Sequence, residues 1–300
     1  MPQATDIKSL IEQTAKQSPT ALARLLTQLE RRGVHLLLDE PQLLQAPRQC
    51  FRLGITGPPG AGKSTLIGRL VQHLRAQNLT VGVIAVDPSS PFSKGAILGD
   101  RIRYADHFAD PGVFIRSLGT RGSLGGLSAS AYLMLRAYDI YGFDVVLIET
   151  VGVGQTELEI INVADRIAVT LVPESGDSIQ AMKAGLLEIA DIYVVNKSDR
   201  PGAATLKNEI EQSVALGQSL YQTAIPEIIS TVAIEDKGLE DFVAIINKMK
   251  ASRPEDQSKD QLQAEARALL SAHYDTDLKS KLDQIVDAST YQAFLKSHVS

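Results

Sequence analysis

The residues with the clearest chemical meaning form one run, Gly57-Pro58-Pro59-Gly60-Ala61-Gly62-Lys63-Ser64. It fits the pattern G-x-x-x-x-G-K-[ST], in which glycines let backbone N–H groups turn toward phosphate oxygens at the start of a helix. In this pattern the lysine binds the β- and γ-phosphates and the serine hydroxyl binds Mg²⁺. The apolar segment Phe51–Thr56 precedes the run, and leucines at helical spacing follow it. The sequence therefore predicts a phosphate-binding loop with contacts from Gly57, Gly60, Ala61, Gly62, Lys63, Ser64 and Thr65.

A second run, Asn196-Lys197-Ser198-Asp199, follows the apolar segment Ile192–Val195. Its pattern N-K-x-D indicates guanine, because an aspartate carboxylate accepts hydrogen bonds from both N1–H and the exocyclic amine of that base. Adenine has an acceptor at N1 and would leave the carboxylate unpaired, which disfavours it by a large factor. We therefore expect GTP and GDP as ligands, with Asn196, Lys197 and Asp199 at the base.

Three acidic residues stand where loops leave predicted strands, at the sheet edge where open α/β sheets bind ligands. Asp87 and Asp100 lie in one loop, and Glu149 stands at the end of the predicted strand that begins at Asp144. Mg²⁺ prefers oxygen ligands and keeps several waters. The candidate Mg²⁺ ligands are thus Ser64, Asp87, Asp100 and Glu149. Asp87 has an alternative role, since an aspartate before a proline often caps a turn.

The residues that catalyse hydrolysis are expected at the same edge of the sheet. Lys63, Asp87 and Glu149 are candidates for stabilising charge and orienting water at the γ-phosphate. Gln155 is a candidate for positioning the attacking water, with helix capping or packing as the alternative. The loop 173–183 is a candidate partner-facing segment, and the glycine-rich run 116–127 is expected to face the nucleotide or a partner. Lys183 or Arg121 could supply positive charge there, or could simply be solvated.

Composition narrows the class of protein. The 300 residues are 44% hydrophobic and 22% charged, enough for one large core. The net charge of −5 disfavours nucleic acid and anionic membranes as partners, because binders of these are basic. The single cysteine, Cys50, leaves no disulfide within the chain and is expected in the core. No signal peptide or bilayer-spanning run is present, so we expect a cytoplasmic protein.

Periodicity divides the chain into three regions. Residues 1–48 are helical, with a start at Ser18-Pro19 and a stop at Gly33. Residues 49–252 alternate short apolar runs with helical stretches, and residues 253–300 form a helical tail. The alternation predicts an α/β fold, a mainly parallel P-loop NTPase sheet covered by helices on both faces, between a small N-terminal helical lobe and a C-terminal helical arm.

These motifs resemble one family. The sequence is similar to the MeaB/ArgK GTPases in the segments 57–65, 86–91, 97–101, 114–117, 124–127, 148–155 and 196–199. The resemblance implies GTP hydrolysis coupled to cofactor loading, protection or rescue in an adenosylcobalamin-dependent acyl-CoA mutase such as methylmalonyl-CoA mutase, by a homodimer held through the C-terminal arm. It carries Lys63, Ser64, Asp87, Asp100 and Glu149 over as nucleotide, Mg²⁺ and hydrolysis residues. It also marks the loop containing Asp177 and Lys183 as a partner-responsive switch.

The sequence departs from the family at two places. The family's Thr-Ser-Ala-like guanine loop is replaced, so that Thr231, Val232 and Ala233 are all candidates for meeting the base. The chain has no tryptophan, which we expect in the arm of this family, so the geometry of the dimer stays open.

Two alternative functions share parts of this pattern. A nickel-insertion GTPase would need imidazole or thiolate ligands, and Cys50 and the five histidines form no cluster in sequence. An ATP-dependent kinase of amino-acid transport proteins is the other alternative, and Asn196 and Asp199 argue against ATP.

Overall fold

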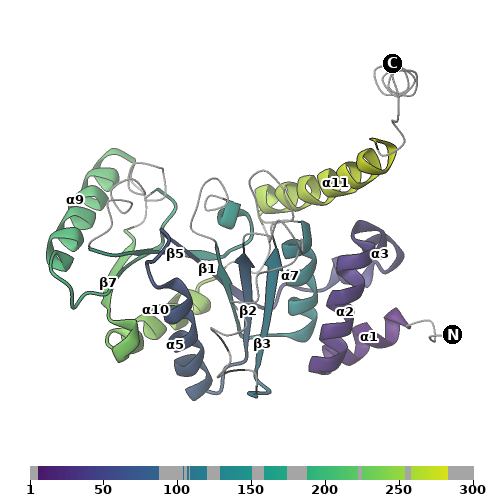
Figure 1. Cartoon of the computed structure of the whole chain (residues 1–300), viewed down its shortest axis with the longest axis horizontal. Helices are drawn as coiled ribbons and strands as arrows, with labels where there is room; N and C mark the ends of the chain where they lie inside the picture. Colours follow the sequence, from purple (N-terminus) through teal and green to yellow (C-terminus); the bar gives the residue numbers. More distant parts are fainter. Residues whose placement is uncertain are drawn as a thin grey trace.

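Seven apolar segments pair into one parallel sheet in the computed structural model (Figure 1). The structure describes residues 6–87, 104, 107, 109–119, 129–150, 159–173, 188–221, 225–253 and 258–282, with the backbone alone at 87, 119, 217–221 and 276–282. The strands are β1 (Phe51–Thr56), β2 (Val81–Asp87), β3 (Val113–Gly119), β4 (Val145–Glu149), β5 (Arg166–Leu171), β6 (Ile192–Asn196) and β7 (Glu227–Thr231). Their order in the sheet is β3-β2-β4-β1-β5-β6-β7, so β1 is central and the predicted α/β fold is confirmed.

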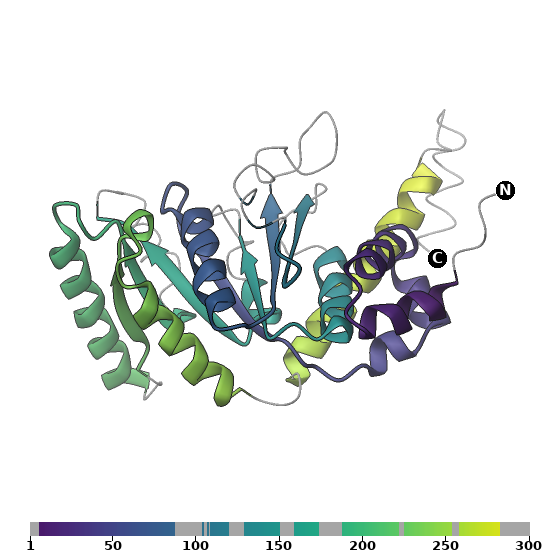
Figure 2. The same cartoon turned by 90° about the horizontal axis from the view of Figure 1, so that it is seen from below.

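Helices and short 3₁₀ turns precede, connect and follow the strands. Their bounds are α1 (Ile7–Ala15), α2 (Pro19–Arg32), α3 (Val34–Asp39), α4 (Gln42–Gln45), α5 (Lys63–Ala76), α7 (Ala129–Tyr141), η3 (Glu159–Asn162), α9 (Ala203–Tyr221), η5 (Ala233–Glu235), α10 (Leu239–Ala251) and α11 (Lys259–Leu282). A parallel sheet needs crossover connections, and α5, α7, η3 and α9 lie on four of them. Figure 2 shows the helices on both sides of the strands.

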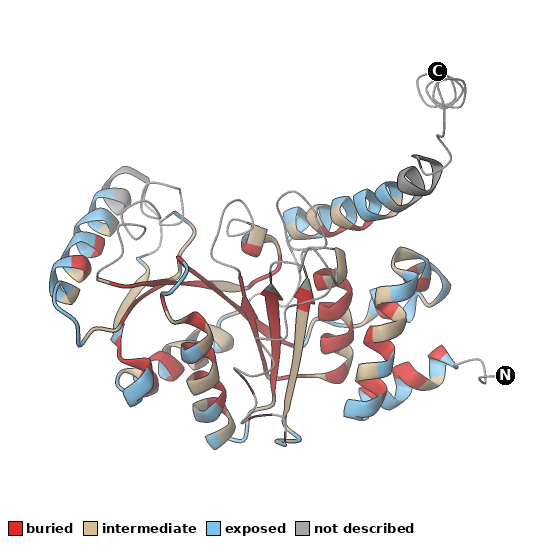
Figure 3. Ribbon diagram, viewed as in Figure 1, coloured by how far each residue is buried: buried red, intermediate tan, exposed pale blue. Residues whose placement is uncertain are grey.

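Alternate strand residues enter two different cores. In β4, Val146 and Ile148 belong to the core shared with α1, α2 and α7, whereas Val145 and Leu147 belong to the core shared with α5 and α10. Successive strand side chains point to opposite faces, so a strand that is apolar throughout must be covered on both. The buried strands between partly exposed helices in Figure 3 follow from this pattern.

Gly54 lets one of the covering elements come close to the central strand. A Cβ at this position of β1 would lie 2.4 Å from Cδ1 of Ile160 in η3. Only glycine leaves room for that packing. The turn η3 therefore sits directly on the strand that leads into the phosphate-binding loop.

The N-terminal helices follow the expected signals. Ser18 caps α2, with Oγ accepting from the N–H of Ala21 at 3.3 Å, and Gly33 ends the helix with φ of 55°. Helix α2 packs on α1 and α7. Cys50 is fully buried, as predicted.

The last described helix, α11, packs against α7 and extends outward past α3 (Figures 1 and 2). Arg136 of α7 donates from Nε and Nη2 to the carboxylate of Glu265, at 2.9 and 2.7 Å. Near the outer end, the rings of His35 and His273 meet edge to face, with centroids 5.0 Å apart. Helix α11 is thus anchored on both α7 and α3.

One prediction about a loop is wrong in part. The glycine-rich run 116–127 was expected to face the nucleotide or a partner, but its first four residues continue β3 to Gly119. Arg116 binds both oxygens of Glu30 in α2, at 2.9 Å each, and Leu118 is buried. Strand pairing with β2 and the contact of Arg116 with the N-terminal lobe therefore stabilise a strand here, although the glycines that follow favour a loop. Residues 120–128, including Arg121, lie outside the described residues.

Candidate functional site

The predicted phosphate-binding loop connects β1 to α5. Gly57, Gly60 and Gly62 have φ of 137°, 76° and 87°, a region that side chains disfavour. Space is also short, because a Cβ on Gly57 would lie 2.1 Å from the carbonyl oxygen of Thr170, and one on Gly62 would lie 2.6 Å from Nδ2 of Asn196. Conformation and packing therefore both favour glycine at positions 57 and 62, whereas at Gly60, where a Cβ would meet no atom within 4 Å, conformation alone does.

Lys63 curls back over this loop. Its side chain is buried, and Nζ donates to the carbonyl oxygens of Gly57 at 2.7 Å and Pro58 at 3.1 Å. Gly62 is the N-cap of α5 and provides no side chain to cap the first N–H groups. Those N–H groups and the ammonium group face the same loop, which suits a phosphate. Thr65 is exposed in the first turn of α5.

Glu149 ends β4 beside the start of α5. It is 6% exposed, and its Oε1 accepts from Oγ of Ser64 at 2.6 Å. Its Oε2 accepts from the hydroxyl of Tyr104, also at 2.6 Å. A hydroxyl and a carboxylate are hard oxygen donors of the kind that Mg²⁺ selects, so this pair fits the predicted cation.

The other predicted Mg²⁺ and hydrolysis residues are described less fully. Asp87 ends β2, two residues beyond Ala85, which pairs with Glu149, so its backbone lies at the same sheet edge. Its side chain is not described. Asp100, Gln155, Asp177 and Lys183 lie outside the described residues.

The guanine motif is joined to the phosphate loop by Asn196. Its Nδ2 donates to the carbonyl oxygen of Ala61 at 2.9 Å, while its Oδ1 accepts from Oγ1 of Thr231 at 3.1 Å and the N–H of Ala233 at 3.3 Å. Lys197 has φ of 54° and donates from Nζ to the carbonyl oxygen of Gly60 at 2.8 Å. Motifs more than a hundred residues apart in sequence thus form one unit.

The last residue of β7 and the two residues after it are the remaining candidates for the base site. Thr231 and Ala233 both contact Asn196, whereas the N–H of Val232 donates to the carbonyl oxygen of Lys237 at 3.1 Å. The ion pair with Glu235 raises the pKa of Lys237 above its usual value, and the charge of Asp199 acts in the same direction. Asp199 is exposed and lies at this loop.

Sequence reasoning missed Tyr104. It lies beyond Asp100, outside every motif singled out in the sequence, and a lone aromatic there gives no functional signal. Its contact with Glu149 joins residues 45 positions apart. Only the register of the strands and the packing on α5 bring the two together.

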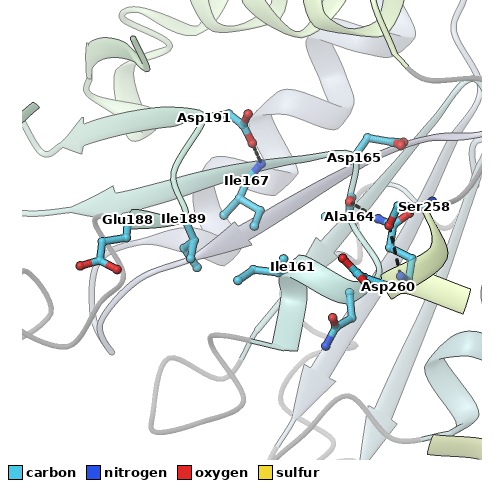
Figure 4. A pocket seen from close by; sticks show the side chains of 11 residues that line it. Ile161, Ala164, Asp165, Ile167, Glu188, Ile189, Asp191, Ser258 and Asp260 are labelled. Carbon is cyan, nitrogen blue, oxygen red and sulfur yellow. Dashed lines mark hydrogen bonds between the residues drawn. The ribbon is translucent and has the colours of Figure 1, made fainter. Parts of the chain in front are cut away.

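A cavity of about 430 Å³ lies at the opposite edge of the sheet (Figure 4). It is bounded by the residues that enter β5 and β6 and by the start of α11. Asp191 faces it and accepts from the N–H of Ile167 at 2.8 Å. None of the predicted nucleotide residues lines this cavity.

The described part of the chain contains neither a metal-ligand cluster nor a membrane-spanning helix. No three His, Cys, Asp or Glu side chains gather there in a way that could hold a metal ion. Within the same residues, no helix has the length and apolarity needed to cross a membrane.

The family comparison matches most of the chain. Residues 22–284 match the model described as methylmalonyl Co-A mutase-associated GTPase MeaB. A Pyrococcus abyssi protein described provisionally as a GTPase is 45% identical over 79% of this chain and 74% of its own length. GTPase ArgK of Escherichia coli is 37% identical over 74% of this chain and 69% of its own. The mouse methylmalonic aciduria type A homolog, a mitochondrial protein, is 39% identical over 76% of this chain and 56% of its own.

Solved structures show the same fold at lower identity. A LAO/AO transport system kinase superposes with a TM-score of 0.66 at 24% identity, over 99% of this chain and 91% of its own. HypB from Helicobacter pylori in complex with nickel gives 0.52 at 19% identity, over 74% of this chain and 94% of its own. These likenesses show that the chain has the same fold as these two proteins.

Proposed function

Because the chain belongs to the MeaB family of P-loop GTPases, we propose that it hydrolyses GTP as a chaperone of an adenosylcobalamin-dependent acyl-CoA mutase, assisting cofactor loading, protection or reactivation. The observation that carries this proposal is the family match over residues 22–284, whose description names methylmalonyl Co-A mutase. The similarity to the mouse methylmalonic aciduria type A homolog supports it.

The geometry supports a division of roles within the site. We assign Lys63 to the β- and γ-phosphates, because its ammonium group lies over the loop carbonyls of Gly57 and Pro58. We assign Ser64 and Glu149, with Asp87 and Asp100, to the cation and its water shell. Mg²⁺, when bound, supplies positive charge that offsets the charge on the phosphate oxygens. Glu149 would orient water at the γ-phosphate, and Gln155 remains a candidate for that task.

The base would be held by the second group of residues. Asn196 joins Ala61 to Ala233, and we assign it the task of fixing the guanine loop against the phosphate loop. We assign Asp199 to the two donors of guanine. Lys197, Thr231, Val232 and Ala233 would complete the walls of the base site.

The proposed domain boundaries separate the central α/β region from the helical regions at the two ends of the chain. We propose an N-terminal lobe at 1–48, a GTPase domain at 49–252 and a C-terminal arm at 253–300 through which two copies associate. Apolar side chains exposed along the described part of the arm support association, namely Leu262, Leu270 and Tyr274. The net charge of −5 supports a protein partner over nucleic acid, and the composition supports the cytoplasm as the site of action.

The test is a comparison of GTP turnover with and without the apo-mutase from the same cell, combined with co-purification of the two proteins. We expect the mutase to bind and to raise turnover by about tenfold or more, since a charge supplied to the transition state accelerates GTPases strongly. Lys183→Ala should reduce that stimulation, and Lys207→Ala, on the exposed face of α9, is the control. A mutase that fails to bind would contradict the proposed partner.

Titration of the protein with ATP and with GTP decides the kinase alternative. A kinase of transport proteins would bind ATP at least as well as GTP, whereas the contacts of Asn196 and the position of Asp199 favour guanine. Equal affinities for ATP and GTP would overturn the assignment of the base.

A further inference from the structure

Tyr104 reaches the tip of β4 from the long connection between β2 and β3. Its hydroxyl donates to Oε2 of Glu149 at 2.6 Å, while Oγ of Ser64 donates to Oε1 at the same distance. Distances of this size are typical of hydroxyl groups bonded to carboxylates. Each oxygen of Glu149 is therefore held by a donor from a different segment, one from the helix that follows the phosphate loop and one from Tyr104.

The ring of Tyr104 is fixed by packing. It is fully buried and belongs to the core that α5 and α10 form with the sheet. A tyrosine ring in a close-packed core cannot shift without moving its neighbours. The donor on Oε2 is thus more rigid than a surface side chain or a water molecule would be.

The chain that follows Tyr104 is tied to α5. The N–H of His107 donates to the carbonyl oxygen of Tyr104 at 3.0 Å, and Nε2 of His107 lies 3.8 Å from where a Cβ on Gly68 would be. Asp110 accepts from Nε and Nη2 of Arg75 at 2.9 Å each. Both Gly68 and Arg75 are on α5, the helix that carries Lys63 and Ser64. Tyr104, α5 and Glu149 consequently form one connected unit.

We propose that Tyr104 is a positioning residue for GTP hydrolysis and acts by fixing the carboxylate of Glu149. The proposal rests on the role assigned to Glu149 above. A carboxylate has about four lone-pair sites, so the bond from Tyr104 fixes its plane and still leaves sites for water or a cation. Displacing a catalytic group by about 1 Å can cost a factor on the order of 10² in rate. A purely structural tyrosine would instead change stability and leave turnover alone.

The test begins with Tyr104→Phe, which removes only the hydroxyl oxygen. We expect kcat for GTP to fall about tenfold, with KM for GTP and the affinity for GDP within about twofold, because the lost bond orients a group at the γ-phosphate side. Tyr138→Phe is the matched control. Tyr138 is also fully buried, and its hydroxyl donates to the carbonyl oxygen of Val83 at 3.3 Å, away from Glu149. Its kcat should equal that of the wild type once both variants are shown to be folded.

A double substitution separates this proposal from the one it rests on. Glu149→Gln alone should lower kcat, and wild-type turnover in that variant would refute the role of Glu149 and the positioning role together. If Glu149→Gln is impaired, adding Tyr104→Phe should lower kcat no further, since the hydroxyl acts through the carboxylate. An additional tenfold loss in the double variant, or a Tyr104→Phe turnover equal to that of Tyr138→Phe, would overturn the positioning role.

Discussion

At the carboxyl edge of the sheet, Glu149 and Asn196 turn toward the phosphate loop, whereas at the amino edge three aspartates turn toward the starts of neighbouring strands. Asp144, Asp165 and Asp191 each stand immediately before a strand. They accept from the N–H groups of Thr80 at 2.9 Å, Arg52 at 2.7 Å and Ile167 at 2.8 Å. A carboxylate thus belongs to the proposed ligand site at one edge, as Glu149, and supports the fold at the other.

The difference has a physical cause. The first N–H groups of parallel strands need acceptors, and buried N–H groups without one are costly. An aspartate before the adjacent strand provides that acceptor and, with it, sets where each strand begins. At the carboxyl edge the loops instead face the N-terminus of α5, which favours anionic ligands. Position along the strand, more than residue type, therefore decides what a carboxylate does.

The largest effect is expected at the carboxyl edge, from Lys63→Ala. Removing the ammonium group should lower kcat for GTP by a factor of about 10³, because charge that develops in the transition state then lacks its donor. Single-turnover hydrolysis at saturating GTP measures this. Lys207→Ala, an exposed lysine on α9, is the control and should behave as the wild type. Retained hydrolysis in Lys63→Ala would remove the distinction between the two edges.

The sequence predicts the residues of short local motifs better than it predicts contacts made through tertiary packing. Lys63, Ser64, Asn196 and Lys197 could be predicted because each lies in a short motif at the carboxyl end of a strand, and such motifs keep their local geometry. Tyr104 could not, because its partner Glu149 is reached only through tertiary packing. For the same reason the contact of His35 with His273, 5.0 Å between centroids, has no signal in sequence.

The next effect concerns nucleotide choice. Asp199→Asn should weaken GTP binding by about 10²-fold and improve binding of xanthosine triphosphate, because an amide offers a donor to the 2-oxo group of xanthine and still accepts from N1–H. Titration of GTP, ATP and xanthosine triphosphate measures the change. Asp236→Asn, in the adjacent loop, is the control, since its carboxylate lies near Arg69 and His73. An unchanged order of affinities would mean that another residue reads the base.

At the amino edge, Asp165→Asn should affect stability and spare activity. The side chain of Asp165 is 2% exposed, and its Oδ1 lies 2.6 Å from Nη2 of Arg48, whose side chain is 7% exposed. The substitution leaves the buried guanidinium of Arg48 without its partner charge, which costs about 3 kcal/mol. The unfolding temperature should therefore fall by several degrees, while kcat at 25 °C stays within about twofold of the wild-type value. Asp260→Asn, an exposed aspartate on the same cavity, is the control. A large loss of kcat in folded Asp165→Asn would show that the amino edge also serves the reaction.

The smallest effect is a pair of opposite pH dependences at the amino edge. Burial raises the pKa of Asp191, and the N–H of Ile167 and Arg166 offset this only in part. For Asp144, burial also acts to raise the pKa, but bonds from Thr80 and Lys250 outweigh it and the pKa is lowered. A carboxylate with a raised pKa weakens the fold while it is ionised, and one with a lowered pKa strengthens it.

Asp191→Asn should therefore raise the unfolding temperature slightly at pH 7, and the gain should disappear as the pH falls through the raised pKa toward the ordinary value for aspartate. Asp144→Asn should lower the unfolding temperature at pH 7, and that loss should disappear only as the pH falls below the ordinary value, through the lowered pKa. Both side chains are about one third exposed, so solvent screening keeps each change small. Unfolding curves from pH 7 to pH 3 measure the two trends, with kcat at pH 7 as the control. If both substitutions changed the unfolding temperature in the same direction, the opposite pKa shifts inferred from the contacts of the two aspartates would be wrong.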